Sequence, residues 1–138
     1  MCAGFRFCEF EFRAADNYYF SMLDILIKKG INWVATDEDI LFKSLSLYDK
    51  KYKGTTDFDR RIIYRPYNYR MDSRHITMVF RDKNLSDMIS FNYNSWNQDE
   101  AARDLINHCN NIGLEMRRDT DRGLLAIVMD GENAWEHY

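Results

Sequence analysis

Short apolar runs along the chain predict the strands of a buried sheet. Three runs of four to six mostly apolar residues occur, and polar or turn residues follow each of them. Runs of this length between polar segments are typical of strands buried on both faces. The three predicted strands are INWVAT (31–36), HITMVF (75–80) and LLAIVM (124–129).

Apolar residues at helical spacing predict amphipathic helices between these strands. Asp16 is a candidate N-cap for a helix over 17–29, and Gly30 supplies a C-terminal stop. The apolar stripe of this helix is Tyr19, Met22, Leu23, Leu26 and Ile27. Residues 40–47 and 84–93 predict two shorter helical segments.

The clearest helix signal follows Asn97, a candidate N-cap with Glu100 in the capping-box position. A buried stripe of Ala101, Leu105, Cys109 and Ile112 follows, and Gly113 is predicted to end the helix. Residues 62–69 are predicted to be extended, with Pro66 excluding a central strand. Apolar strands that alternate with amphipathic helices favour an α/β fold with a parallel sheet.

Composition narrows the class of protein. The 138 residues are 46% apolar and 30% charged, which is typical of one globular domain. The net charge of −3 and the absence of a basic block argue against nucleic acid as a partner. No apolar run reaches about 18 residues, so no membrane span is expected. The three cysteines, Cys2, Cys8 and Cys109, have no CxxC spacing and favour a reducing cytoplasm.

Acidic residues follow each predicted strand. Asp37 and Glu38 follow the first, Asp82 the second and Asp130 the third. In parallel α/β proteins the carboxyl ends of strands share one rim, so these carboxylates are expected to converge. Carboxylates beside aromatic residues suit glycoside cleavage. Each acid has a simpler interpretation as a helix N-cap, and both interpretations stay open here.

Other chemistries fit the sequence poorly. The three histidines lack metal-ligand spacing, and there is no Gly-rich phosphate loop or GxSxG motif. Cys109 lies on a predicted apolar stripe, where a core residue is more common than a nucleophile. The sequence offers no cage for a metal ion or an organic cofactor.

Four segments follow one another along the chain: GINWVATDEDIL, YRPYNY, FRDKNLSDMISFNY and VMDGENAWEHY. Together they resemble glycoside hydrolase family 57, and in particular its α-amylase and amylopullulanase-like members. The likeness covers residues 16–138. The resemblance implies an α/β fold, a fragment of the parallel (β/α)7 barrel of the glycoside hydrolase/deacetylase type, acting on α-glucans with retention of configuration. It also implies that no metal ion or organic cofactor is needed.

The resemblance also assigns site residues. Asp130 opens the DGEN motif and matches the general acid/base of the family. Other motif positions that the resemblance places along the substrate cleft are Trp33, Asp37, Glu38, Arg81, Asp82, Asp87, Glu132 and Trp135. Glu132 is a candidate partner of Asp130. Arg81 is a candidate to hold Asp82 or Asp87, although an ordinary structural ion pair is an equal alternative.

The chain departs from the family pattern at its N-terminal end. The family nucleophile is a glutamate in a WPxEGS-like stretch, and its position falls near Ala15, within RAADN. Residues 1–15 therefore look unmatched, as if a different start or a shifted reading frame had replaced them. Glu9 and Glu11 lie upstream in a different pattern. Ser90 stands where the family usually has glycine.

These expectations describe part of an α-glucan-active hydrolase that is inactive alone. Its substrate would be an α-glucan or maltooligosaccharide, and three strands cannot close a barrel, so open strand edges favour self-association. The alternative is a noncatalytic module that binds glucan or complements another fragment. A third interpretation, an unrelated small α/β protein, requires the motif matches to be fortuitous.

Overall fold

The computed structural model describes residues 8–9, 22–71, 73–118, 123–129 and 131. Within these residues the fold is mixed α/β, with a four-stranded sheet in the order β1-β3-β4-β2. The strands are β1 (Cys8–Glu9), β2 (Trp33–Asp37), β3 (Tyr67–Met71) and β4 (Arg74–Arg81). The predicted strands at 31–36 and 75–80 are thus confirmed, with shifted ends.

The sheet is mixed, and the prediction of a parallel sheet is wrong in one place. β2 pairs with β4 in parallel, and β1 pairs with β3 in parallel. β3 and β4 pair antiparallel, with Tyr67 opposite Met78. These two strands are close neighbours in the sequence, and a parallel pair needs a crossover of a dozen or more residues, so a hairpin is the only pairing open to them.

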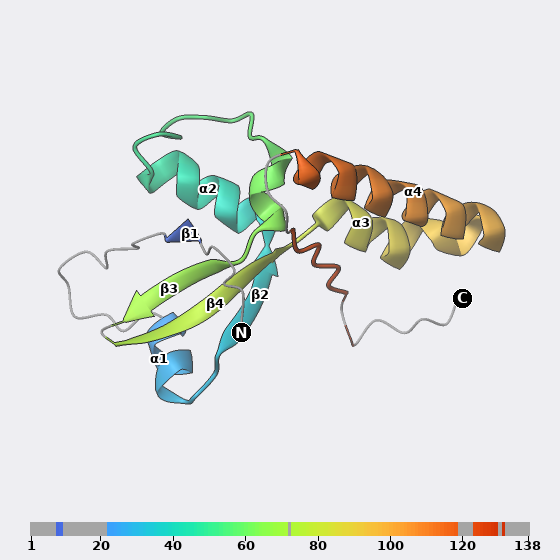
Figure 1. The fold of residues 1–138 in the computed structure, drawn as a ribbon. Coiled ribbons are helices and arrows are strands. Elements are labelled where there is room, and N and C mark those ends of the chain that lie inside the picture. The colour runs from blue at the N-terminus through green and yellow to red at the C-terminus, as the bar shows by residue number, and fades with distance from the viewer. Residues whose placement is uncertain (1–7, 10–21, 72, 119–122, 130, 132–138) are drawn as a thin grey trace.

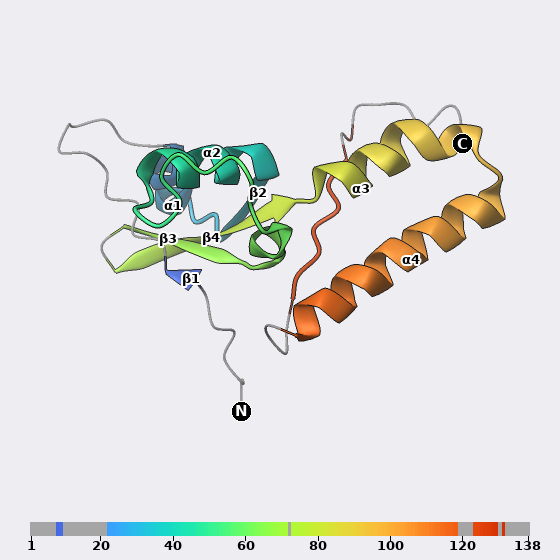
Figure 2. The same cartoon turned by 90° about the horizontal axis from the view of Figure 1, so that it is seen from above.

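Two helices cover one face of the sheet. They are α1 (Met22–Lys28) and α2 (Glu38–Tyr48), which lie on the same side of the sheet in Figure 2. Ile76, Met78 and Phe80 alternate along β4 and are buried beneath them. The helices contribute Ile27, Leu41 and Leu45 to the same core. α1 ends as predicted at Gly30, whose φ of 79° favours glycine.

Within the described residues, the opposite face of the sheet is exposed along β2. Trp33 and Ala35 of β2 are exposed, and the Trp33 side chain is 64% accessible. The sequence predicts that this strand is buried on both faces, and this prediction is wrong for the face that carries Trp33 and Ala35. Because side chains alternate across a strand, Asp37 lies on the same face as Trp33 and Ala35.

A long helix extends away from the sheet in Figure 1. It is α4 (Gln98–Arg117), and Asn97 caps it by accepting hydrogen bonds from the amides of Asp99 and Glu100. The predicted cap is confirmed, but the predicted end at Gly113 is wrong. The residues after Gly113 are good helix formers, and Met116 is buried, which outweighs a cost of about 1 kcal/mol for an interior glycine. The apolar stripe that the sequence predicts to be buried on this helix is only half-buried; it consists of Ala101, Leu105, Cys109 and Ile112.

Short helical segments occupy two predicted regions. Residues Arg60–Tyr64 form a 3-10 helix where an extended segment was expected, and β3 begins only after Pro66. Because β3 lies between β1 and β4, Pro66 precedes an inner strand rather than excluding one. The predicted helix at 84–93 is confirmed as α3 (Lys83–Asp87), a π-helical turn (Met88–Asn92) and a 3-10 turn (Tyr93–Ser95).

The predicted strand at 124–129 makes a single bridge, from Ala126 to Arg81 of β4. It is not a strand within the described residues. The segment passes only the last residues of β4, so its next hydrogen bond goes to a side chain of α3: the Val128 amide donates to the Ser86 hydroxyl at 3.2 Å. The Asp82 amide donates to the Ala126 carbonyl at 2.8 Å. The segment is thus docked at the carboxyl end of β4.

Candidate functional site

The carboxyl ends of β2 and β4 lie side by side. The two strands are parallel and in register, and Asp37 pairs with Arg81 at their ends. Asp82 follows Arg81 directly, so the acids that end these two strands share one rim. This part of the predicted convergence is confirmed.

The acids at this rim also begin helices. The Asp37 side chain caps α2 by accepting a hydrogen bond from the Asp39 amide at 2.9 Å. The Asp82 side chain caps α3 by accepting from the Leu85 amide at 3.0 Å. The N-cap interpretation, left open by the sequence, is therefore correct for both residues.

Arg60 links two buried carboxylates at the rim. Its guanidinium donates to both carboxylate oxygens of Glu38, at 2.8 and 2.9 Å, and lies 3.2 Å from Asp82 Oδ1. Glu38 and Asp82 are 4% and 2% exposed. The Tyr64 hydroxyl donates to Asp82 Oδ2 at 2.7 Å. A bidentate arginine is among the stronger side-chain contacts, and it balances the charges that would otherwise be buried alone.

Burial and charge shift the pKa values of Arg60 and Tyr64. Burial lowers the pKa of Arg60, but hydrogen bonds and charge from Glu38 and Asp82 outweigh it, and the pKa is raised. Burial raises the pKa of Tyr64, and its hydrogen bond to Asp82 raises it further. Arg60 is therefore a permanent cation, and Tyr64 is a hydrogen-bond donor at neutral pH.

Arg81 forms a second link across the rim. Its Nε lies 3.1 Å from Asp37 Oδ2, and its Nη2 donates to Asp87 Oδ1 at 2.6 Å. Its Nη1 also donates to the Val128 carbonyl at 3.4 Å. The expected contact with Asp87 is confirmed, whereas Asp82 is held by Arg60 and Tyr64 instead. Arg81 thus ties β2 and α3 to the segment that leads to residue 130.

Sequence reasoning missed Arg60, Tyr64 and Ser86. The one available signal for Arg60 is an arginine pair, Arg60–Arg61, directly after Asp59 in a polar stretch of the sequence. No sequence pattern indicated that this loop folds back over the rim. Tyr64 was placed in an extended segment, and its contact with Asp82 depends on the 3-10 turn.

The structure separates one predicted residue from the rim. Trp33 is the first residue of β2 and Asp37 is the last. A rise of about 3.3 Å per residue puts their backbones roughly 13 Å apart. Trp33 therefore lies at the other end of the strand from the acids. Asp130, Glu132, Trp135 and the Ala15 region lie outside the described residues.

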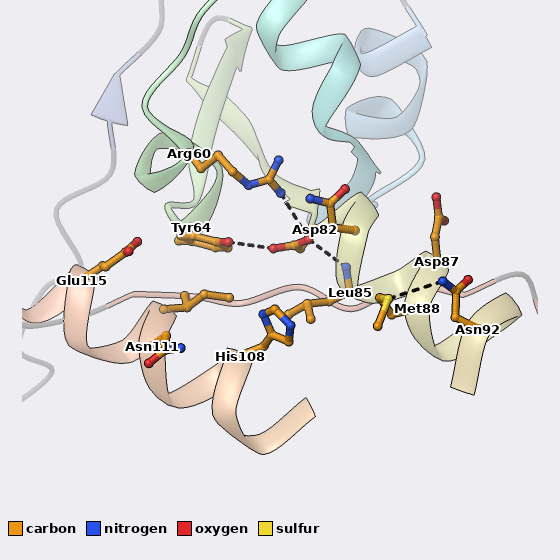
Figure 3. Close-up of a pocket in the computed structure, with 12 residues that line it drawn as sticks. Arg60, Tyr64, Asp82, Leu85, Asp87, Met88, Asn92, His108, Asn111 and Glu115 are labelled. Carbon is orange, nitrogen blue, oxygen red and sulfur yellow. Dashed lines mark hydrogen bonds and ion pairs between the residues drawn. The ribbon is translucent and has the colours of Figure 1, made fainter. Parts of the chain in front are cut away.

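A pocket of about 560 Å³ opens beside the rim. Figure 3 shows Arg60 and Tyr64 on one side and His108 of α4 facing them from the other. Asp82 lies between Arg60 and Leu85, at the base of α3. The lining residues are Arg60, Tyr64, Asp82, Asn84, Leu85, Asp87, Met88, Asn92, His108, Asn111, Ile112 and Glu115. The pocket thus combines the buried cluster with neutral polar and apolar side chains.

In the part of the chain that the structure describes, no group of three or more histidine, cysteine, aspartate or glutamate side chains is placed to hold a metal ion. Among the same residues, no helix is long and apolar enough to cross a membrane.

The fold and this rim define an α/β protein with clustered, internally paired carboxylates at the ends of two parallel strands. The family model described as glycosyl hydrolase family 57 matches residues 4–138, so the chain belongs to this family. The match confirms the resemblance and begins at residue 4, before Asp16. Comparisons with curated proteins and with solved structures gave no match. Family membership indicates a glycoside hydrolase origin and carbohydrate as the general class of substrate.

Proposed function

We propose that the chain is part of the catalytic domain of a retaining, α-glucan-active glycoside hydrolase, with Asp130 as its general acid/base. The observation that carries the proposal is the docking of the segment before Asp130. Within a family 57 chain, Ala126 and Val128 hydrogen-bond to the rim where Asp37, Glu38 and Asp82 gather. The rim is the end of the sheet where α/β enzymes place their chemistry.

The proposed reaction needs two carboxyl groups, about 5–5.5 Å apart in a retaining enzyme. Asp130 would protonate the leaving oxygen and then remove a proton from the attacking water. A glutamate would form the covalent glycosyl intermediate. The position matched to that glutamate lies near Ala15, where the sequence reads RAADN. We therefore propose that the chain alone has no turnover.

The proposal also interprets the sheet as part of a (β/α)7 barrel. Barrel helices pack on the outside, and α1 and α2 both lie on one face of the sheet, as Figure 2 shows. The face of the sheet opposite these helices, which carries Trp33 and Asp37, would then point toward the inside of the barrel. The antiparallel pairing of β3 with β4 departs from an all-parallel barrel and would be a local addition to it. In this scheme residues 4–138, which the family model matches, are part of the catalytic domain, and β1 (Cys8–Glu9) belongs to its sheet.

A missing carboxylate can be replaced from solution, and this provides a direct test. Azide would attack the anomeric carbon of a p-nitrophenyl α-maltoside, forming a C–N bond while the C–O bond to p-nitrophenol breaks. Asp130 would transfer its proton to the departing oxygen. The expected result is p-nitrophenol release that depends on azide, gives a β-maltosyl azide, and is lost in Asp130→Asn. Release without azide would show that another carboxylate is the nucleophile.

The second candidate is a noncatalytic glucan-binding or fragment-complementing module. The internal pairing of Glu38, Asp82 and Asp87 with arginines favours it, because paired carboxylates are already satisfied. Affinity electrophoresis in gels that contain amylose or pullulan separates the two candidates. Retention by the gel without any azide-dependent release would establish the binding module. No retention by either glucan would overturn α-glucan as the ligand.

A further inference from the structure

The pocket between the rim and α4 has the size of a ligand site. Its volume of about 560 Å³ lies within the roughly 300–1,000 Å³ of small-molecule pockets. It is formed by three parts of the chain: the 3-10 turn with Arg60 and Tyr64, the α3 region, and one side of α4. The family motifs of the sequence assign no role to the α4 side of the pocket.

The charges around the pocket disfavour an anionic ligand. Among the described residues, Arg60 is the one arginine or lysine that lines the pocket, and it is bound by Glu38 and Asp82. The lining also carries the carboxylates of Asp87 and Glu115, and Asp87 is paired with Arg81 outside the lining. A phosphate or uronate would therefore meet like charge without a free cation to receive it.

The remaining lining side chains suit a neutral ligand with hydroxyl groups. Asn84, Asn111 and His108 offer hydrogen-bond donors and acceptors, and each is on an exposed part of its helix. Leu85, Met88 and Ile112 add an apolar surface, and Leu85 is 3% exposed. Pockets that join a largely apolar surface to a few placed polar groups are typical ligand sites.

The His108 ring is placed for such a contact. Figure 3 shows it directed into the pocket, across from Tyr64. On its other side, Nε2 lies 3.6 Å from Asp104 Oδ2, and Asp104 in turn accepts a hydrogen bond from the Tyr93 hydroxyl at 2.8 Å. Asp104 therefore links the His108 ring to Tyr93.

We infer that this pocket is a subsite for neutral sugar units, with His108 and Asn84 as hydrogen-bonding residues and Leu85, Met88 and Ile112 as the apolar surface. The inference rests on the proposed function and deepens it by assigning α4 to carbohydrate binding. The pocket would hold units of the glucan beside the rim, rather than a phosphate or a metal ion.

The test is a titration of the ¹⁵N-labelled full chain with maltoheptaose, with cellohexaose and with inorganic phosphate. His108→Ala and Asn84→Ala remove exposed side chains of the pocket, so both variants should fold. His75→Ala is the matched control, because His75 is exposed at the start of β4 and outside the lining. We expect maltoheptaose to bind about five- to tenfold more weakly to each pocket variant, the effect of losing one hydrogen bond, and unchanged to the control.

Each of the other outcomes identifies which of the two proposals is wrong. Equal maltoheptaose affinity in all variants would overturn the pocket and leave the proposed function standing. Binding of cellohexaose but not maltoheptaose, weakened in the pocket variants, would overturn α-glucan as the substrate and support the pocket. Phosphate binding that is lost in the pocket variants would overturn a neutral ligand. No binding of either sugar by the unmodified chain would overturn both proposals.

Discussion

Arg60 binds Glu38 through two nitrogens while a third contact joins it to Asp82, so one guanidinium neutralises two buried carboxylates. Replacing it with methionine leaves both carboxylates buried without a cation. Breaking a fully buried pair costs about 3–5 kcal/mol, and we expect about 2–3 here because the Arg60 side chain is 39% exposed. Urea unfolding monitored by circular dichroism measures this change in the free energy of unfolding.

The neighbouring residue provides the control for Arg60→Met. Arg61 also forms an ion pair, with Asp59, but both partners are largely solvent-accessible. Exposed ion pairs contribute little because solvent screens them, so Arg61→Met should leave stability nearly unchanged. Equal effects of the two substitutions would contradict the special role of Arg60.

The raised pKa of Tyr64 predicts that the folded chain loses stability at high pH. Burial and the hydrogen bond to Asp82 raise its pKa in the folded chain above its value of about 10 in the unfolded chain. Its contribution is thus fully present below about pH 10 and declines above it, because the unfolded chain ionises first. The stability advantage of the unmodified chain over Tyr64→Phe should be constant from about pH 8 to 9 and fall by about 1 kcal/mol from about pH 10 to 11.

Unfolding curves of both chains at each pH provide the measurement. Tyr48→Phe is the control, because the Tyr48 side chain is 78% exposed on α2 and its loss removes a surface hydroxyl. A wild-type advantage over Tyr64→Phe that rises with pH would contradict the direction of the pKa change.

The elements that the sequence predicted well are those with a local cause. Asn97 caps α4 through its own side chain, and the alternation along β4 follows the burial of Ile76, Met78 and Phe80. The features missed depend on contacts between distant residues. Arg60 is 22 residues from Glu38, and nothing local to either residue encodes their pairing. The rim acids were predicted, whereas the cations that neutralise them were only half predicted, through Arg81.

The exposed face of β2, on the side of the sheet opposite α1 and α2, predicts that the chain self-associates. Trp33 lies on this face, and β2 is at an edge of the sheet within the described residues. An exposed edge strand with a large apolar side chain favours pairing between chains. We expect sedimentation velocity to show oligomers that decrease in Trp33→Lys and persist in Met22→Lys, whose side chain on α1 is 74% exposed. A monomer at all concentrations would contradict this prediction.

The hydrogen bond between Ser86 and Val128 predicts that Ser86 keeps the segment before Asp130 docked at the rim. Its hydroxyl is fully buried, donates to the Asp82 carbonyl at 2.6 Å and accepts from the Val128 amide at 3.2 Å. Ser86→Ala leaves this amide without its partner, at a cost of about 1–3 kcal/mol. Amide exchange at Val128 should therefore accelerate about tenfold or more, since a factor of ten corresponds to roughly 1.4 kcal/mol of local opening.

The control for this exchange experiment is Ser44→Ala, a half-buried serine on α2. The Asp82 amide, which donates to Ala126, reports on the other end of the same contact. If Ser86 docks the whole segment, exchange at Asp82 should accelerate together with Val128, because both bonds open when the segment leaves the rim. Faster exchange at Val128 alone would limit Ser86 to a local role. Unchanged exchange at both amides would show that Arg81 and the Asp82–Ala126 bond hold the segment, and the approach to Asp130, without Ser86.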